Sequence, residues 1–274
     1  MDKEIGKFFT YPKKTERFGE GGLRIKNINK KLKFSLITVV LNNKELLEKT
    51  IESVLNQNFK NFEYIIIDGG SNDGTLEILK KYNNKIDYWL SERDNGIYDA
   101  FNKGMELSKG DYLGIINSDD TYRSNALNII SKNINKNENI DFIFGSVQKR
   151  WGLLSGYKPW KIFFTWGFYT SHSTGFFIKR TSAKKVGFYN LKYKYHSDYD
   201  YFFRMIVKKK LKGLATLKSE ITGDFRSGGF SSKMKFKDSL KEDFRIRRDN
   251  GQNILFLIII YLYRYIRNFK KAIS

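Results

Sequence analysis

The 274-residue chain contains no cysteine and only two prolines. Without cysteine, a disulfide framework, thiolate-bound zinc and a thiol nucleophile are all excluded. The first seven residues also lack the apolar segment of a secretory signal. Both absences fit a reducing compartment, so we expect the protein in the cytoplasm.

Acidic residues are scarce relative to basic ones: 29 Asp and Glu face 50 Lys and Arg, a net charge of +21. Nucleic acid, an anionic membrane surface and acidic small molecules are all suitable partners for such a chain. The basic excess is concentrated in residues 1–33, which we interpret as a basic leader, and in residues 233–274. The centre is closer to balanced, so charge indicates location more than reaction.

Apolar runs that suit buried strands alternate with segments of helical spacing. The expected strands are 34–41, 62–67, 86–90, 111–116 and 141–147, and the helices between them are 44–55, 75–82, 94–107 and 125–134. A further strand is expected at 174–178, and helices at 198–207, 233–249 and 253–271. The alternation predicts an α/β fold with a Rossmann-like, mostly parallel central sheet flanked by helices, followed by a C-terminal helical extension.

Two adjacent carboxylates, Asp119 and Asp120, follow the expected strand 111–116. Ligands bind beyond the carboxyl ends of strands in such sheets, and hard oxygen ligands suit Mg²⁺ or Mn²⁺. Asp68 ends the strand 62–67 and falls at the same edge. The alternative for the pair is a strand end followed by a helix cap.

Six segments together carry a resemblance to a known family. They are Ser35–Asn42, Ser53–Gln57, Ile67–Thr75, Asp94–Gly104, Asn117–Asp120 and His196–Asp200. In this order and spacing they resemble family-two glycosyltransferases of the GT-A fold, of the type that builds bacterial surface polysaccharides such as lipopolysaccharide or capsule. The resemblance spans residues 34–232, which we expect to form the glycosyltransferase domain.

The resemblance implies an inverting, metal-dependent transfer of a hexosyl or N-acetylhexosaminyl group. The donor would be a nucleotide-diphosphate sugar, with uridine the commonest base in the family, and Asp119 and Asp120 would hold Mg²⁺ or Mn²⁺. Asp198 would be the base that takes the proton of the acceptor hydroxyl, with Asp200 the weaker candidate; the alternative for Asp198 is a carboxylate that stabilises the start of its helix. The chain departs from the family pattern at Asn117 and Ser197, where acidic residues are usual. One negative charge fewer at the metal motif predicts weak metal binding before the nucleotide arrives.

The remaining site residues also follow from the resemblance. Those expected at the donor are Thr38, Val39, Asn42, Asp68, Gly69, Ser71, Asp94, Asn102, Lys103, Asn117 and Ser118. His172 and Arg226 are expected at the acceptor or the diphosphate, Arg226 within a glycine-rich loop that closes over it. Each has a structural alternative: a helix cap for Asn42, a solvated helix face for Lys103, a buried histidine for His172 and a surface turn for Arg226.

The segment Asn253–Tyr263 is apolar on all sides but too short to cross a bilayer. Basic residues flank it, which suits a helix lying in the interface of an anionic leaflet. We therefore expect peripheral association with the inner face of the plasma membrane, and an acceptor that is a growing glycan or a polyprenyl-diphosphate-linked one. The alternative is a helix buried against the domain or in a homodimer.

Two other functions compete with this interpretation. A nucleic-acid-binding protein would explain the charge, but no RNA or DNA motif appears, so we expect no nucleic acid partner. A catalytically impaired nucleotide-sugar-binding relative would explain the departures at Asn117 and Ser197.

Overall fold

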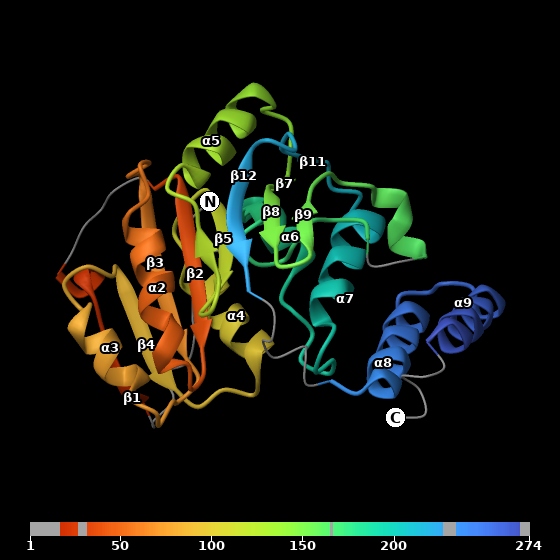
Figure 1. Ribbon diagram of the computed structural model, residues 1–274, viewed down its shortest axis with the longest axis horizontal. Coiled ribbons are helices and arrows are strands. Elements are labelled where there is room, and N and C mark those ends of the chain that lie inside the picture. Colours follow the sequence, from red (N-terminus) through yellow and green to blue (C-terminus); the bar gives the residue numbers. More distant parts are fainter. Residues whose placement is uncertain (1–16, 27–31, 165–166, 227–233, 269–274) are drawn as a thin grey trace.

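The computed structural model describes residues 17–26, 32–164, 167–226 and 234–268 (Figure 1). Its central sheet has eight strands in the order β1-β4-β3-β2-β5-β10-β7-β11. These strands are β1 (Arg17–Gly21), β2 (Phe34–Val40), β3 (Phe62–Asp68), β4 (Tyr88–Glu92), β5 (Tyr112–Asn117), β7 (Phe142–Phe144), β10 (Phe176–Lys179) and β11 (Gly213–Ala215). Strands β2, β3, β4 and β5 are parallel neighbours, as the alternating sequence pattern predicted.

Helices cover both faces of the sheet. They are α2 (Lys44–Leu55), α3 (Thr75–Lys81), α4 (Ile97–Leu107), α5 (Ala126–Lys136), α6 (Arg180–Val186) and α7 (Ser197–Phe203), and α7 continues into five residues of π-helix at Arg204–Lys208. Short 3-10 helices lie at Leu23–Lys26 and Pro159–Phe163.

Strand β2 shows why its sequence is apolar throughout. Ile37 and Val39 belong to the core shared with α4 and α7, while Leu36 and Val40 belong to the core shared with α2, α3 and α5. Because side chains alternate between the faces of a strand, a strand covered on both sides must be apolar at every position.

A second, smaller sheet has the order β6-β12-β8-β9. Its strands are β6 (Thr121–Tyr122), β8 (Ser146–Lys149), β9 (Gly152–Leu154) and β12 (Ile221–Phe225). The single strand expected at 141–147 is therefore divided between β7 and β8. The chain changes sheets at Gly145, where a Cβ atom would lie 2.3 Å from the Thr222 hydroxyl oxygen, so only glycine fits.

Two strands depart from the expected parallel pattern. Strand β1 comes from the segment interpreted as a leader and pairs antiparallel with β4 at the sheet edge. Its sequence, Arg-Phe-Gly-Glu-Gly, is short and glycine-rich, so the apolar pattern of the sequence did not predict a strand there. Strand β10 runs antiparallel between β5 and β7. Residues 1–16 and 27–31 of the expected leader lie outside the described residues.

The C-terminal helices α8 (Phe236–Asp249) and α9 (Ile254–Arg267) lie together at the end of the molecule opposite β1 (Figure 1). They contact the rest of the fold through α7 and through the segment around Pro159–Phe163, where the Phe163 carbonyl accepts a hydrogen bond from Arg247 of α8. In the part of the chain that the structure describes, no helix has the length and apolarity needed to span a bilayer.

Candidate active site

The turn after β3 is held by the carboxylate of Asp68, which is fully buried. Its oxygens accept hydrogen bonds from the Ser71 amide (3.1 Å), the Ser71 hydroxyl (2.5 Å) and the Ser91 hydroxyl (2.5 Å). Asp68 thus lies at the carboxyl edge of the sheet, as the sequence indicated, and it shapes the turn there.

The loop after β2 is tied to this turn by Asn42. Its amide donates to the Ser71 hydroxyl at 2.7 Å, and its side-chain oxygen accepts from the Asn72 amide at 2.9 Å. Asn42 has a positive φ of 51°, a conformation that asparagine tolerates better than most residues. It does not cap α2, whose N-cap position is Asn43.

Asp94 lies against the same turn from the loop before α4. A Cβ atom on Gly69 would approach the Asp94 carboxylate to 2.4 Å, so glycine is required where the two loops meet. Burial raises the pKa of Asp94, and the neighbouring charges of Asp99 and Asp68 raise it further. The expected donor residues Asp68, Gly69, Ser71 and Asp94 therefore form one contiguous cluster, in which Ser71 and Asp94 are part-exposed and Asp68 and Gly69 lie buried behind them.

Asp119 and Asp120 follow β5 at the same edge. Asp120 is 1% exposed, and its Oδ1 atom accepts a hydrogen bond of 2.8 Å from the Arg226 amide. Burial raises the pKa of Asp120 to about 7, and the adjacent charge of Asp119 contributes. Its Oδ2 atom is buried without a hydrogen-bond partner among the described residues.

This acidic pair fits a divalent cation that is shared with a substrate. A buried carboxylate oxygen without a donor favours a cation, because an unpaired charge is costly inside a protein. The side-chain oxygen of Asn117 is also buried and without a partner in the described part of the chain. No cluster of three His, Cys, Asp or Glu residues suited to a metal occurs in the described ranges. Mg²⁺ and similar ions often bind one or two carboxylates plus substrate phosphates, which matches this arrangement.

Basic groups converge on the pair. Burial raises the pKa of Asp119, and the nearby Arg226 guanidinium partly opposes this rise. Lys149, which the sequence did not single out, lies over the Phe225 ring at 4.0 Å and interacts electrostatically with Asp120. Ser118 is fixed by Asn43, whose amide group donates to the Ser118 carbonyl (3.1 Å) and hydroxyl (2.9 Å). The glycine-rich loop expected after Arg226 lies outside the described residues.

Asp198 occupies the first turn of α7 and is half-buried. Its Oδ1 atom accepts from the Tyr199 amide at 2.9 Å and also interacts with the Tyr169 hydroxyl. It lies 3.2 Å from the Tyr98 hydroxyl, which shares its one proton between Asp198 and the Tyr195 carbonyl at 2.7 Å. Burial raises the pKa of Asp198 to about 6, although these hydrogen bonds partly oppose the shift. A carboxylate with this pKa can accept a proton near neutral pH.

One short segment connects Asp198 to the acidic pair. Tyr169 interacts with Asp198, and four residues later the Ser173 hydroxyl accepts a hydrogen bond of 2.8 Å from the Asn117 amide. Four residues span at most about 14 Å. Tyr98 makes a second connection, because it begins α4 directly after the loop that holds Asp94. One short segment of the chain thus links the expected base to the loop that carries the expected metal ligands.

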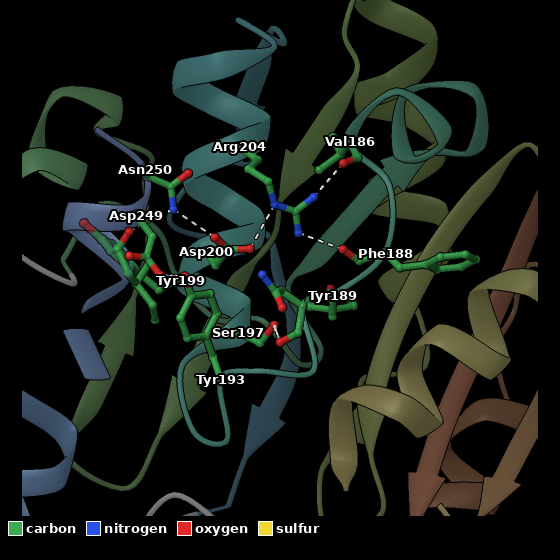
Figure 2. A network of polar contacts seen from close by, with 12 residues as sticks. Val186, Phe188, Tyr189, Tyr193, Ser197, Tyr199, Asp200, Arg204, Asp249 and Asn250 are labelled. Atoms are coloured by element: carbon green, nitrogen blue, oxygen red, sulfur yellow. Dashed lines mark hydrogen bonds and ion pairs between the residues drawn. The ribbon is translucent and has the colours of Figure 1, made fainter. Parts of the chain in front are cut away.

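Asp200, two residues after Asp198, contacts different partners (Figure 2). It accepts from the Arg204 guanidinium at 2.9 Å and from the Asn250 side chain at 2.8 Å. Arg204 also donates to the carbonyls of Val186 and Phe188. Asp200 therefore joins α7 to α8, while Ser197 donates to the Asn190 carbonyl.

The expected donor contacts of Thr38 and Val39 need correction. Both lie in the interior of β2, where the sheet is covered on each face. The Thr38 hydroxyl pairs with the buried Tyr64 hydroxyl at 2.9 Å, and Val39 packs in the core on the α4 side. Neither side chain is available at the sheet edge.

Asn102 and Lys103 also have structural roles. Asn102 makes two hydrogen bonds to the Tyr189 backbone, of 2.9 and 2.8 Å. Lys103 is fully buried in an ion pair of 2.8 Å with Glu92, so it lies neither on a solvated face nor at a phosphate. In helix α4 both side chains therefore point toward their packing partners. Asp94, in the loop before α4, lies at the turn after β3 instead.

His172 is enclosed by aromatic rings, and its Nε2 atom lies 2.6 Å from the Tyr189 hydroxyl. Burial lowers the pKa of His172 to about 3, so the ring is neutral at physiological pH. It therefore brings no positive charge to a diphosphate, which corrects that part of the expectation.

Comparison with known proteins identifies the family and the fold. The family model described as glycosyl transferase family 2 matches residues 35–211, more than half of the chain. A glycosyltransferase of PGL/p-HBAD biosynthesis from Mycobacterium tuberculosis is 29% identical over 180 residues, covering 62% of this chain and 68% of its own.

Two solved structures share the fold. Staphylococcus aureus TarS (residues 1–349), in complex with UDP-GlcNAc, has a TM-score of 0.62 at 15% identity, covering 86% of this chain and 73% of its own. The mannosyltransferase PcManGT from Pyrobaculum calidifontis, in complex with GDP-Man and Mn²⁺, has a TM-score of 0.62 at 12% identity, covering 97% and 76%. The chain therefore belongs to glycosyl transferase family 2 and has the GT-A fold.

Proposed function

We propose that this glycosyltransferase moves a hexosyl or N-acetylhexosaminyl group, with inversion, from a UDP-sugar to a hydroxyl of a lipid-linked or growing cell-surface glycan. The observation that carries the proposal is Asp198, a half-buried carboxylate with a pKa of about 6, held by Tyr98 within one short segment of the acidic pair. The mycobacterial relative supports glycosyl transfer by its name, and the TarS complex with UDP-GlcNAc supports uridine as the base.

Each group then has a defined task. Asp198 accepts the proton of the acceptor hydroxyl, which contributes roughly 10²–10⁴-fold to the rate. Tyr98 and Tyr169 hold the carboxylate in place. Ser71 and Asp94, supported by the buried Asp68 and Gly69, bind the nucleoside and sugar, and Asn42 positions the turn.

Asp119 and Asp120, with Asn117 beside them, would hold Mg²⁺ or Mn²⁺. When bound, such an ion stabilises the negative charge of a departing diphosphate by several kcal/mol. The PcManGT complex with Mn²⁺ supports this assignment. Arg226 and Lys149 bring positive charge to the same place, and charge-assisted Arg–phosphate bonds are strong.

Because its acceptor would be anchored in a lipid bilayer, we propose that the enzyme acts peripherally at the cytoplasmic face of the plasma membrane.

The test is Asp198→Asn, with the exposed Asp238→Asn in α8 as a matched control. We expect Asp198→Asn to lower kcat by at least about 10²-fold while its melting temperature stays near that of the wild type, because the amide preserves shape and removes the base. Asp238→Asn is expected to leave kcat unchanged. Equal rates for Asp198→Asn and wild type would remove Asp198 as the base.

A further inference from the structure

Helix α9 presents its apolar residues to solvent. Seven of them, all between 43% and 71% exposed, are Ile254, Leu255, Ile258, Ile259, Leu262, Tyr263 and Ile266. At 100° per residue these positions fall within about half of the helix circumference. A helix at the surface of a soluble domain normally shows the opposite arrangement.

The polar and inward contacts of α9 confirm this inverted orientation. Arg264 turns toward α8 and forms an ion pair with the buried Asp243. Leu257 is 1% exposed, and Tyr261 packs edge-to-face on Phe244 at 5.7 Å. The inner side of α9 is therefore already occupied by α8, and the outer side has no covering element in the described part of the chain.

Exposed aromatic residues extend this surface. Phe164 packs on Phe256 of α9 at 5.4 Å, and Trp160 packs on Phe164 at 6.3 Å. Both Trp160 and Phe164 are exposed, at 61% and 45%. We call these two residues, together with the seven exposed residues of α9, the apolar face. A groove of about 440 Å³ lies beside it, lined in part by Phe164, Phe256 and Val207.

We infer that the apolar face docks on a lipid bilayer that contains anionic lipid. Trp and Tyr at the margin of an apolar surface are typical of the headgroup region. Basic side chains adjoin it, because Lys161 lies by Trp160 and Arg267 ends α9; the neighbouring helix α8 also exposes Lys237 and Lys241. Anionic lipid attracts such groups.

A second copy of the chain fits this surface less well. The chain carries a net charge of +21, so self-association would bring two strongly basic molecules together. A bilayer with anionic lipid instead offers a hydrocarbon interior for the apolar side chains and negative headgroups for the basic ones. The inference deepens the membrane location in the proposed function and rests on it, but its test measures lipid binding without sugar transfer.

The experiment is flotation of the full chain with vesicles of phosphatidylcholine alone or mixed with phosphatidylglycerol. We expect binding to the mixed vesicles, weakened by high salt. Leu255→Glu with Ile259→Glu should weaken it at least about tenfold, or about 1.4 kcal/mol. The matched control is Leu217→Glu, because Leu217 is as exposed as Leu255 and lies away from α9. It should bind as the wild type does.

Two results would overturn the inference: a wild-type chain that does not bind the mixed vesicles, or a double variant that binds them as well as the wild type does. A dimer that the double variant separates, with no lipid binding by wild type, would assign the face to a second copy. Thermal stabilisation by nucleotide, measured on the same variants, reports on the transferase site alone. Failure of lipid docking is therefore distinguishable from failure of the proposed reaction.

Discussion

At the scale of single residues, the environment of Asp198 separates it from its neighbour Asp200. The two share one short helix, yet Asp198 contacts tyrosine hydroxyls while Asp200 pairs with Arg204. Burial without a cationic partner raises the pKa of Asp198. Asp200 is instead held between Arg204 and Asn250, so the proposed base is Asp198.

This difference predicts a pH profile. The pKa of Asp198 is raised to about 6, so the carboxylate is protonated, and inactive as a base, below that pH. We expect kcat at saturating donor and metal to be level above pH 7 and to fall about tenfold per pH unit well below pH 6. A profile that stays flat down to pH 5 would contradict the assignment.

The hydroxyl of Tyr98 gives a second prediction at this scale. Tyr98→Phe removes a hydrogen bond that favours the charged form of Asp198, so the apparent pKa of the base should rise. We expect the acid limb of the profile to move to higher pH, with kcat lower near pH 6 and the fold intact. An unchanged acid limb would show that Tyr98 does not position the base.

At the scale of elements, α4 lies close to the sheet because of Gly104. A Cβ atom there would lie 2.3 Å from the Ile37 methyl carbon of β2. Gly104→Ala should therefore lower the free energy of unfolding by about 1–3 kcal/mol, despite the better helix propensity of alanine. Urea denaturation measures this. Lys132→Ala, at an exposed position of α5, should change it by less than about 0.5 kcal/mol.

The junction between α7 and α8 depends on Asp200, which is 3% exposed. Asp200→Ala leaves the Arg204 guanidinium without its carboxylate and removes one of the two acceptors of the Asn250 side-chain amide. We expect the free energy of unfolding, measured by urea denaturation, to fall by about 2–4 kcal/mol, because removing one member of a buried ion pair leaves the other charge unpaired. A loss below about 0.5 kcal/mol would mean that the junction does not depend on this residue.

At the scale of the whole molecule, the parallel strands bring acids from distant parts of the chain to one edge. Since that site has two carboxylates, donor and metal should stabilise the fold together. We expect UDP with Mn²⁺ to raise the melting temperature by several degrees, GDP to do less, and EDTA to remove the effect. Stabilisation by UDP that persists in EDTA would separate donor binding from the metal.

The sequence by itself determined the alternating core of the sheet, most helices and the family. Apolar periodicity reflects which positions are buried, so it predicts an element wherever the same face is buried along its whole length, as in β2 or α2. The sequence also predicted that Asp68, Asp119 and Asp120 lie at the carboxyl edge of the sheet, since neighbouring parallel strands end at the same edge.

Only the tertiary structure decided which polar residues are exposed to a ligand. Lys103 and Asn102 stand in a motif that resembles a donor site, but packing of α4 commits them to Glu92 and the Tyr189 backbone. Strand β1 and the antiparallel β10 depend on partners far along the chain, which local pattern does not encode. The outward direction of the apolar side of α9 likewise follows from its inner contacts with α8, because a helix that is apolar all round does not reveal which side is free.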